Sequence, residues 1–195
     1  MRLKTLTCLA IAGAFVASAS GLQAKTKTNF SGTSFGGSKS YYKGYGYKGK
    51  TTVSYSRKLK PGTIVISTKE RRLYYVLGNG KAIKYGVGVG RKGFSWRGRN
   101  RITRKVEWPT WTPPAEMRAR EAKKGRKLPI TMKGGPSNPL GARAMYLGNT
   151  LYRIHGTNAS YTIGGAVSSG CIRMLNKEVK DLYKRVRVGT LVIVE

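Results

Sequence analysis

Residues 25–52 contain no aliphatic side chain: they are Gly, Ser, Thr, Lys and Tyr with one Asn and two Phe. A segment of this composition cannot bury enough apolar surface to offset the entropy of ordering, so it is expected to be disordered. We therefore predict a flexible linker over residues 25–58 and place the start of ordered structure near Leu59. The remaining residues, 59–195, are about 135 in number and suffice for one domain with its own core.

The pattern within residues 59–195 is mainly that of β-structure. Short β-branched and aromatic runs alternate with turn residues, and Asn79-Gly80 is typical of a tight hairpin turn because both residues tolerate positive φ. Strands are expected at residues 63–67, 72–77, 81–89, 145–147, 151–155 and 191–194, and helices at residues 116–127 and 176–186. Asn176 is the expected N-cap of the second helix. The predicted fold is therefore mainly β, a sandwich or mixed sheet with one or two helices.

The N-terminus has the three parts of a secretory signal peptide over residues 1–24. Arg2 and Lys4 precede an apolar run, and small residues follow it. The apolar run is short for a transmembrane span. Cleavage after Ala24 fits the pattern, and cleavage after Ala19 is the alternative. The chain is therefore expected to be exported to the periplasm or cell wall, with no membrane span in its mature form.

Charge narrows the class of partner. The chain has 38 Lys and Arg against 7 Asp and Glu, a formal net charge of +31. Such a field attracts anionic partners. Nucleic acid is an unsuitable partner for an exported protein, whereas an anionic cell envelope suits one. The tyrosines and lysines of the predicted linker suit a flexible tether to such a surface.

Two side chains carry the candidate chemistry. His155 is the only histidine, and Cys171 is the only cysteine outside the predicted signal peptide, which holds Cys8. A thiol with an imidazole able to take its proton is the minimal equipment for covalent acyl transfer. One His and one Cys do not make a zinc site, and the seven acids are scattered along the chain, so we expect neither a metal nor another cofactor.

The residues around Cys171 are suited to a tight turn. Gly170 permits sharp bending and a close approach to the sulfur, and the N–H groups of Gly170 and Cys171 are candidates for an oxyanion hole. Ser168 and Ser169 are expected to support the turn. No acid lies near His155 in sequence, so a backbone carbonyl close to Gly156 is the expected partner that orients the imidazole.

The stretch HGTNASYTIGGAVSSGCIRM, residues 155–174, resembles the signature of the YkuD-type L,D-transpeptidase catalytic domain family. Residues 61–66, 85–90 and 138–141 resemble other segments of that domain, so the resemblance covers residues 61–195. It implies that Cys171 is the nucleophile and His155 the base. Arg173, Ser169 and Gly170 would contact substrate, although Arg173 could equally be structural. Many members carry a second histidine where this chain has Ser169.

The resemblance implies a reaction as well. Cys171 would attack the carbonyl that joins a diaminopimelate-type residue to D-Ala in a peptidoglycan stem tetrapeptide, D-Ala would leave, and an amine of a second stem would resolve the thioester into a 3→3 cross-link. An envelope protein as amine acceptor, or water, would give tethering or hydrolysis. A non-catalytic basic wall-binding protein and a cysteine protease are the other readings that the residues leave open.

Overall fold

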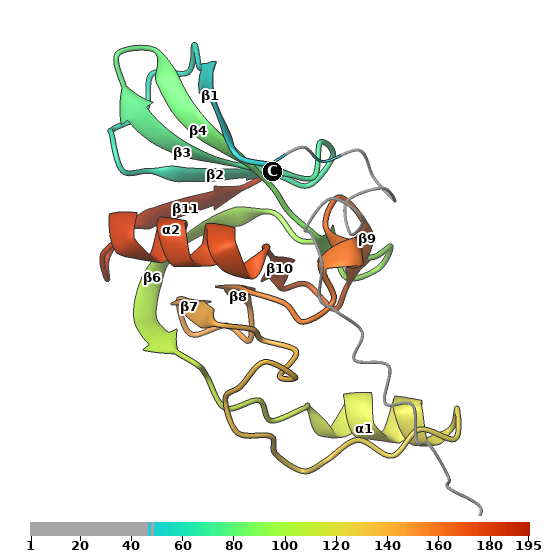
Figure 1. The fold of residues 1–195 in the computed structure, drawn as a ribbon. Coiled ribbons are helices and arrows are strands. Elements are labelled where there is room, and N and C mark those ends of the chain that lie inside the picture. Colours follow the sequence, from blue (N-terminus) through green and yellow to red (C-terminus); the bar gives the residue numbers. More distant parts are fainter. Residues whose placement is uncertain (1–46, 48) are drawn as a thin grey trace, which may run out of the picture. The chain divides into compact units, whose positions relative to one another are not determined.

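The computed structural model describes residue 47 and residues 49–195 (Figure 1). The predicted signal peptide, Cys8 and the predicted linker up to residue 46 lie outside the described residues. Among the residues that are described, no helix is both long and apolar enough to cross a membrane.

A mixed sheet of nine strands dominates the described part of the chain, in the order β1-β4-β3-β2-β11-β6-β7-β8-β10. Its strands are β1 (Thr51–Ser54), β2 (Ile64–Ser67), β3 (Arg72–Gly78), β4 (Lys81–Gly86), β6 (Gly98–Glu107), β7 (Arg143–Leu147), β8 (Arg153–His155), β10 (Ile172–Arg173) and β11 (Leu191–Val194). The other elements are the helices α1 (Ala115–Ala122) and α2 (Asn176–Arg185), a 3-10 turn (Ser160–Thr162), and a small parallel pair of β5 (Val89–Gly90) with β9 (Ala166–Ser168). The predicted mainly β fold with one or two helices is confirmed.

Strand β6 joins the two halves of the sheet (Figure 1). Its first residues pair with β11, and from Ile102 onward it pairs with β7. The register shifts between Ile102 and Arg104, an irregularity of the kind that bends a strand. Strand β11, the last in the chain, lies between β6 and β2 and is parallel to β2.

One hydrophobic cluster holds both halves of the sheet and the helix α2. The helix contributes Val179, Leu182 and, just beyond its end, Val186, which are spaced so that they lie on one face. The sheet contributes residues from both halves, such as Ile64, Leu73, Ile102, Met145 and Ile154. The core therefore fixes the strands on either side of β6 relative to each other.

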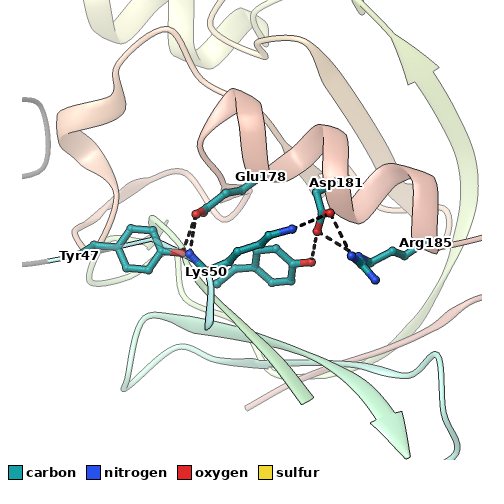
Figure 2. A network of polar contacts seen from close by, with 6 residues as sticks. Tyr47, Lys50, Glu178, Asp181 and Arg185 are labelled. Atoms are coloured by element: carbon teal, nitrogen blue, oxygen red, sulfur yellow. Dashed lines mark hydrogen bonds and ion pairs between the residues drawn. The ribbon is translucent and has the colours of Figure 1, made fainter. Parts of the chain in front are cut away.

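Ordered structure begins before residue 59, so the predicted linker boundary is wrong. Strand β1 pairs antiparallel with the edge of β4. The ring of Tyr47 is buried against Gly86, where a Cβ atom would come within 2.7 Å of the ring. Both carboxylates on one face of α2, Glu178 and Asp181, bind this segment through Tyr47 and Lys50 (Figure 2).

The helices differ from the prediction in detail. Helix α1 ends at Ala122, five residues earlier than expected, and positive φ at Gly125 (φ +73°) follows it. Leu175 is the N-cap of α2, and it makes no side-chain cap. Asn176 is therefore wrongly predicted as the cap. Its side chain is used elsewhere, in the framework of the site described below.

Candidate active site

Strands β8 and β10 bring the two predicted catalytic residues onto one face of the sheet. They pair in parallel, with Ile172 opposite Ile154 and Arg173 opposite His155. Ile154 and Ile172 point into the core, so the alternation of a strand directs His155 and Arg173 to the opposite face. Cys171 directly precedes β10 and lies beside Arg153.

His155 is buried, with 4% of its surface exposed. Its Nδ1 lies 2.5 Å from the carbonyl oxygen of Gly156. A carbonyl only accepts hydrogen bonds, so Nδ1 carries the proton and Nε2 is left as the basic nitrogen. The expected backbone carbonyl near Gly156 is thus present.

The imidazole is held in its neutral form. Burial lowers the pKa of His155 to about 3, and the positive charge of Arg173 adds to this effect; the carbonyls of Gly156 and Leu140 oppose it. A buried imidazole flanked by a cation is more costly to protonate than one in water. In the resting site His155 can therefore accept a proton but has none to donate from Nε2.

The turn before Cys171 is fixed by Ser168. The buried Ser168 hydroxyl donates to the Cys171 carbonyl at 2.6 Å and accepts the Gly170 N–H at 3.1 Å. The Gly170 N–H is therefore occupied by Ser168 in this structure, and its predicted place in an oxyanion hole stays a prediction. Among the hydrogen bonds of the described residues, none uses the Cys171 N–H.

Gly170 is required at its position for two reasons. Its φ of +108° is unfavourable for any residue with a side chain. A Cβ atom there would also overlap the ring of Tyr152. That ring stacks on Trp96 with centroids 4.7 Å apart, and Trp96 Nε1 donates to the Gly170 carbonyl at 2.9 Å.

The Trp96–Tyr152 pair was not predicted from the sequence. Trp96 lies in a Gly- and Arg-rich segment with no motif around it, and Tyr152 reads as an ordinary strand residue. Only the fold brings them together over Gly170. Ser169, a predicted substrate contact, accepts a 3.4 Å hydrogen bond from Arg91.

The Cys171 thiol is partly exposed and forms no disulfide. Its sulfur lies 3.7 Å from the Leu151 carbonyl oxygen and 4.0 Å from an Arg153 guanidinium nitrogen. In this state the thiol contacts these two groups rather than hydrogen-bonding His155. Cys171 and His155 lie on the same face of two neighbouring strands. Among the contacts of the described residues, no hydrogen bond joins the thiol to the imidazole.

Two asparagines hold the loops that cover His155. The Asn176 side chain accepts the Ala142 N–H at 2.9 Å and donates to the Thr157 carbonyl at 3.1 Å. The buried Asn138 donates to the carbonyls of Pro109, Met132 and Lys133. Asn176 thus joins the residues just before β7 to the loop that follows His155, and Asn138 holds together segments around Pro109 and Met132.

Comparison with known proteins identifies the fold and the family. The family model of the YkuD L,D-transpeptidase catalytic domain matches residues 61–194. The chain belongs to the YkuD L,D-transpeptidase catalytic domain family. The site described above lies within the matched YkuD region.

Curated YkuD relatives support the same assignment. The chain is 43% identical over 134 residues to "Probable L,D-transpeptidase YbiS" of Escherichia coli K12, which covers 66% of this chain and 43% of that protein. It is 44% identical over 133 residues to "Probable L,D-transpeptidase ErfK/SrfK" of the same strain, covering 66% and 42%. The chain thus spans less than half the length of these curated relatives.

Solved structures agree on the YkuD fold. The catalytic domain of the Enterococcus faecium L,D-transpeptidase, solved with ertapenem acylating it, matches with a TM-score of 0.53 and 18% identity. The match covers 71% of this chain and 100% of that domain. An L,D-transpeptidase from Mycobacterium smegmatis matches with a TM-score of 0.52 at 19% identity, over 68% of this chain and 58% of that one.

Proposed function

We propose that this chain is an exported L,D-transpeptidase that acts on peptidoglycan stem tetrapeptides in the periplasm or cell wall. Membership of the YkuD family supports the activity. The observation that carries the proposal is the placement of Cys171 and a neutral, buried His155 on one face of two adjacent parallel strands. The signal-peptide pattern of residues 1–24 and the charge of +31 support an anionic envelope as the place of action.

In the first half of the reaction, Cys171 forms a thioester. Its sulfur attacks the carbonyl carbon that joins the diaminopimelate residue to D-Ala, and the thiol proton passes to Nε2 of His155. The tetrahedral intermediate then expels D-Ala, whose nitrogen takes that proton as the carbon–nitrogen bond breaks. The His155 imidazole returns to its neutral form.

In the second half, an acceptor amine attacks the thioester carbonyl. The amine gives a proton to His155, the carbon–sulfur bond breaks, and the leaving sulfur of Cys171 recovers the proton. With the side-chain amine of a second stem as acceptor, the product is a 3→3 cross-link. No cofactor takes part in this scheme.

The surrounding residues have distinct roles in the proposal. The Cys171 N–H is available to the oxyanion of the tetrahedral intermediate, where a positioned donor contributes about 3 kcal/mol. Gly170 keeps the approach to the sulfur open, and Ser169 and Arg173 contact the substrate. Residues 51–54 belong to the catalytic sheet as strand β1, so the tether to the envelope is proposed to lie N-terminal to Tyr47.

The test is a mass-spectrometric assay with purified protein and tetrapeptide muropeptides, beside a Cys171→Ala control. Release of D-Ala with new tripeptide–tetrapeptide dimers, absent from the control, is the expected result. Loss of D-Ala without dimers would indicate hydrolysis, or an enzyme whose protein acceptor is missing from the assay. No change that depends on Cys171 would overturn the enzymatic proposal in favour of a basic wall-binding protein.

A second readout isolates the acyl-enzyme. The intact mass of the protein, measured within the first turnovers, is expected to rise by the mass of the stem acyl group in wild type. His155→Gln is expected to slow this step by about 100-fold or more, because general-base catalysis contributes 10²–10⁴-fold. An adduct that forms equally in Cys171→Ala would show that the nucleophile is another residue.

A further inference from the structure

Two arginines beside the thiol have no counterion among the described residues. Arg153 and Arg173 come from β8 and β10 and share the face that carries His155 and Cys171. The Nε atoms of both are buried and make no hydrogen bond among the described residues. Neither guanidinium forms an ion pair with any carboxylate of the described residues.

Most of the acidic side chains of the chain pair with residues other than Arg153 and Arg173. The chain has seven of them, all in the described part. Six contact partners remote from the two arginines: Glu70 with Tyr74, Glu107 with Arg143, Glu121 with Arg126, Glu178 with Tyr47 and Lys50, Asp181 with Lys50 and Arg185, and Glu195 with Arg57. The seventh, Glu116, lies in the first turn of α1.

A partly buried guanidinium without a carboxylate partner is costly, because its charge loses water and its Nε–H donor is left without replacement. Burial lowers the pKa of Arg173, which is the electrostatic sign of this cost. Two such groups on the open face of one site indicate that an anion completes it. Arginine pairs with a carboxylate through two parallel hydrogen bonds, so the planar fork selects that group.

Arg153 also fixes where the anion would lie. One of its terminal nitrogens is 4.0 Å from the Cys171 sulfur and donates to the Leu151 carbonyl at 3.1 Å. Its guanidinium carbon lies 5.1 Å from the centre of the Tyr146 ring. A carboxylate held by Arg153 would therefore be next to the atom that the sulfur attacks.

We propose that Arg153 and Arg173 form a carboxylate-binding site beside Cys171 that holds the free carboxylate of the residue leaving from the acyl donor. The identity of that carboxylate rests on the proposed transpeptidase function. In a stem tetrapeptide the D-Ala carboxylate is one carbon beyond the scissile nitrogen, and this is the placement that Arg153 favours. The second free carboxylate of the donor, on the diaminopimelate side chain, is the other source of the same chemistry.

The site is tested first without any peptide. Iodoacetate and iodoacetamide alkylate a thiol by the same displacement of iodide, but only iodoacetate places a carboxylate next to the reacting carbon. The two rates at Cys171 are followed by peptide mass spectrometry, which separates this residue from Cys8. The ratio of the iodoacetate rate to the iodoacetamide rate at Cys171 is divided by the same ratio for glutathione, which corrects for the intrinsic reactivity of the two reagents.

Wild type is expected to favour iodoacetate by about tenfold relative to glutathione, the equivalent of one charge-assisted hydrogen bond. Arg153→Gln and Arg173→Gln are each expected to bring the ratio near that of glutathione, and Arg153→Lys to keep part of the preference. Arg104→Gln is the matched control. The guanidinium carbon of Arg104 lies 3.9 Å from the centre of the same Tyr146 ring, and the substitution removes the same charge. A preference that survives in both glutamine variants, or is lost equally in Arg104→Gln, would overturn the site.

Peptide substrates then assign the carboxylate. Amidation of the D-Ala carboxylate is expected to lower the wild-type kcat/KM by about 10–100-fold and to cause little further loss in Arg153→Gln, because the two changes remove one interaction. Fully additive losses, or a loss on amidating the diaminopimelate carboxylate instead, would overturn the assignment to the leaving residue. The alkylation result stands whether or not wild type releases D-Ala, so failure of the proposed function and failure of the site are distinguishable.

Discussion

The Tyr47 hydroxyl donates a 2.8 Å hydrogen bond to Oε1 of Glu178, 131 positions further along the chain (Figure 2). The same oxygen accepts the N–H of Lys50 at 2.9 Å. Glu178 is 2% exposed and burial raises its pKa. Its other oxygen has no hydrogen-bond partner within the described part of the chain. The segment before β1 is thus tied to α2 by a buried acceptor.

Tyr47→Phe is expected to destabilise the protein by about 1–3 kcal/mol, because it leaves a buried carboxylate oxygen with one donor fewer. The free energy of unfolding from urea titration measures this loss. Tyr74→Phe is the matched control, since its hydroxyl also donates to a glutamate, Glu70, but at an exposed position. The control should change stability by less than about 0.5 kcal/mol, and equal losses would show that burial does not set the strength of the bond.

His155 should make stability depend on pH below neutrality. Its pKa is about 3 when folded, against 6.5 ordinarily, so the unfolded chain binds one proton more between these values. Stability supplied by the neutral imidazole is complete above pH 6.5 and falls by up to about 1.4 kcal/mol per pH unit as pH drops toward 3.

The measurement is the difference in unfolding free energy between wild type and His155→Gln at pH 7.5, 5.5 and 4.5. The raised pKa of Glu178 acts in the opposite sense, since ionisation of this buried acid weakens the folded state as pH rises. It is present in both proteins and cancels in the difference. A difference independent of pH would contradict a neutral, buried His155.

Ser168→Ala should impair the site more than the fold. The hydroxyl closes the turn by bonding both Cys171 and Gly170, so its loss frees the thiol to move. We expect kcat/KM for D-Ala release to fall by about 10–100-fold, as for a lost positioning interaction of 1.4–2.8 kcal/mol. Ser169→Ala leaves the turn closed and removes a 3.4 Å contact with Arg91 together with the proposed substrate contact, so it should lower kcat/KM less. A larger loss for Ser169→Ala than for Ser168→Ala would contradict the role of Ser168 in holding the turn.

Gly170→Ala is expected to lose activity and stability together, because the new methyl group meets both a positive φ and the Tyr152 ring. Gly80→Ala is the comparison, since Gly80 has φ +66° with open space around it and carries only the backbone strain of about 1 kcal/mol. Adding Tyr152→Ala to Gly170→Ala should restore part of the stability. Thermal unfolding measures all of these, and equal losses for the two glycine variants would exclude the ring contact as a cause.

The strands that the sequence predicts are those whose residues include runs of aliphatic side chains. The runs at β2, β3 and β11 are confirmed, and the turn at Asn79-Gly80 has the expected positive φ. Strand β6 was not predicted, because its ten residues are mostly charged or polar and only Ile102 among them is buried. Strand β1 carries no signal either, since it pairs only at the exposed edge of β4.

The candidate site also has parts that the sequence predicts and parts that it does not. The motif singles out Cys171 and His155, and local reasoning anticipates the carbonyl of Gly156 as the partner of the imidazole. Contacts between remote segments escape such reasoning. The stacking of Trp96 on Tyr152, the use of Asn176 to bridge two loops, and the occupied N–H of Gly170 all depend on which strands the fold places side by side.

The place of β11 affects how the chain reaches this structure. The strand that joins the β2 side of the sheet to β6 follows both of these strands in the sequence, so until residue 194 is available both flanking strands present open edges. Pairings between such distant segments make folding slow, and open edges invite contacts with other chains. Partial products that stop before Leu191 should therefore aggregate or be degraded, and the sheet is expected to form only after β11 has been synthesised.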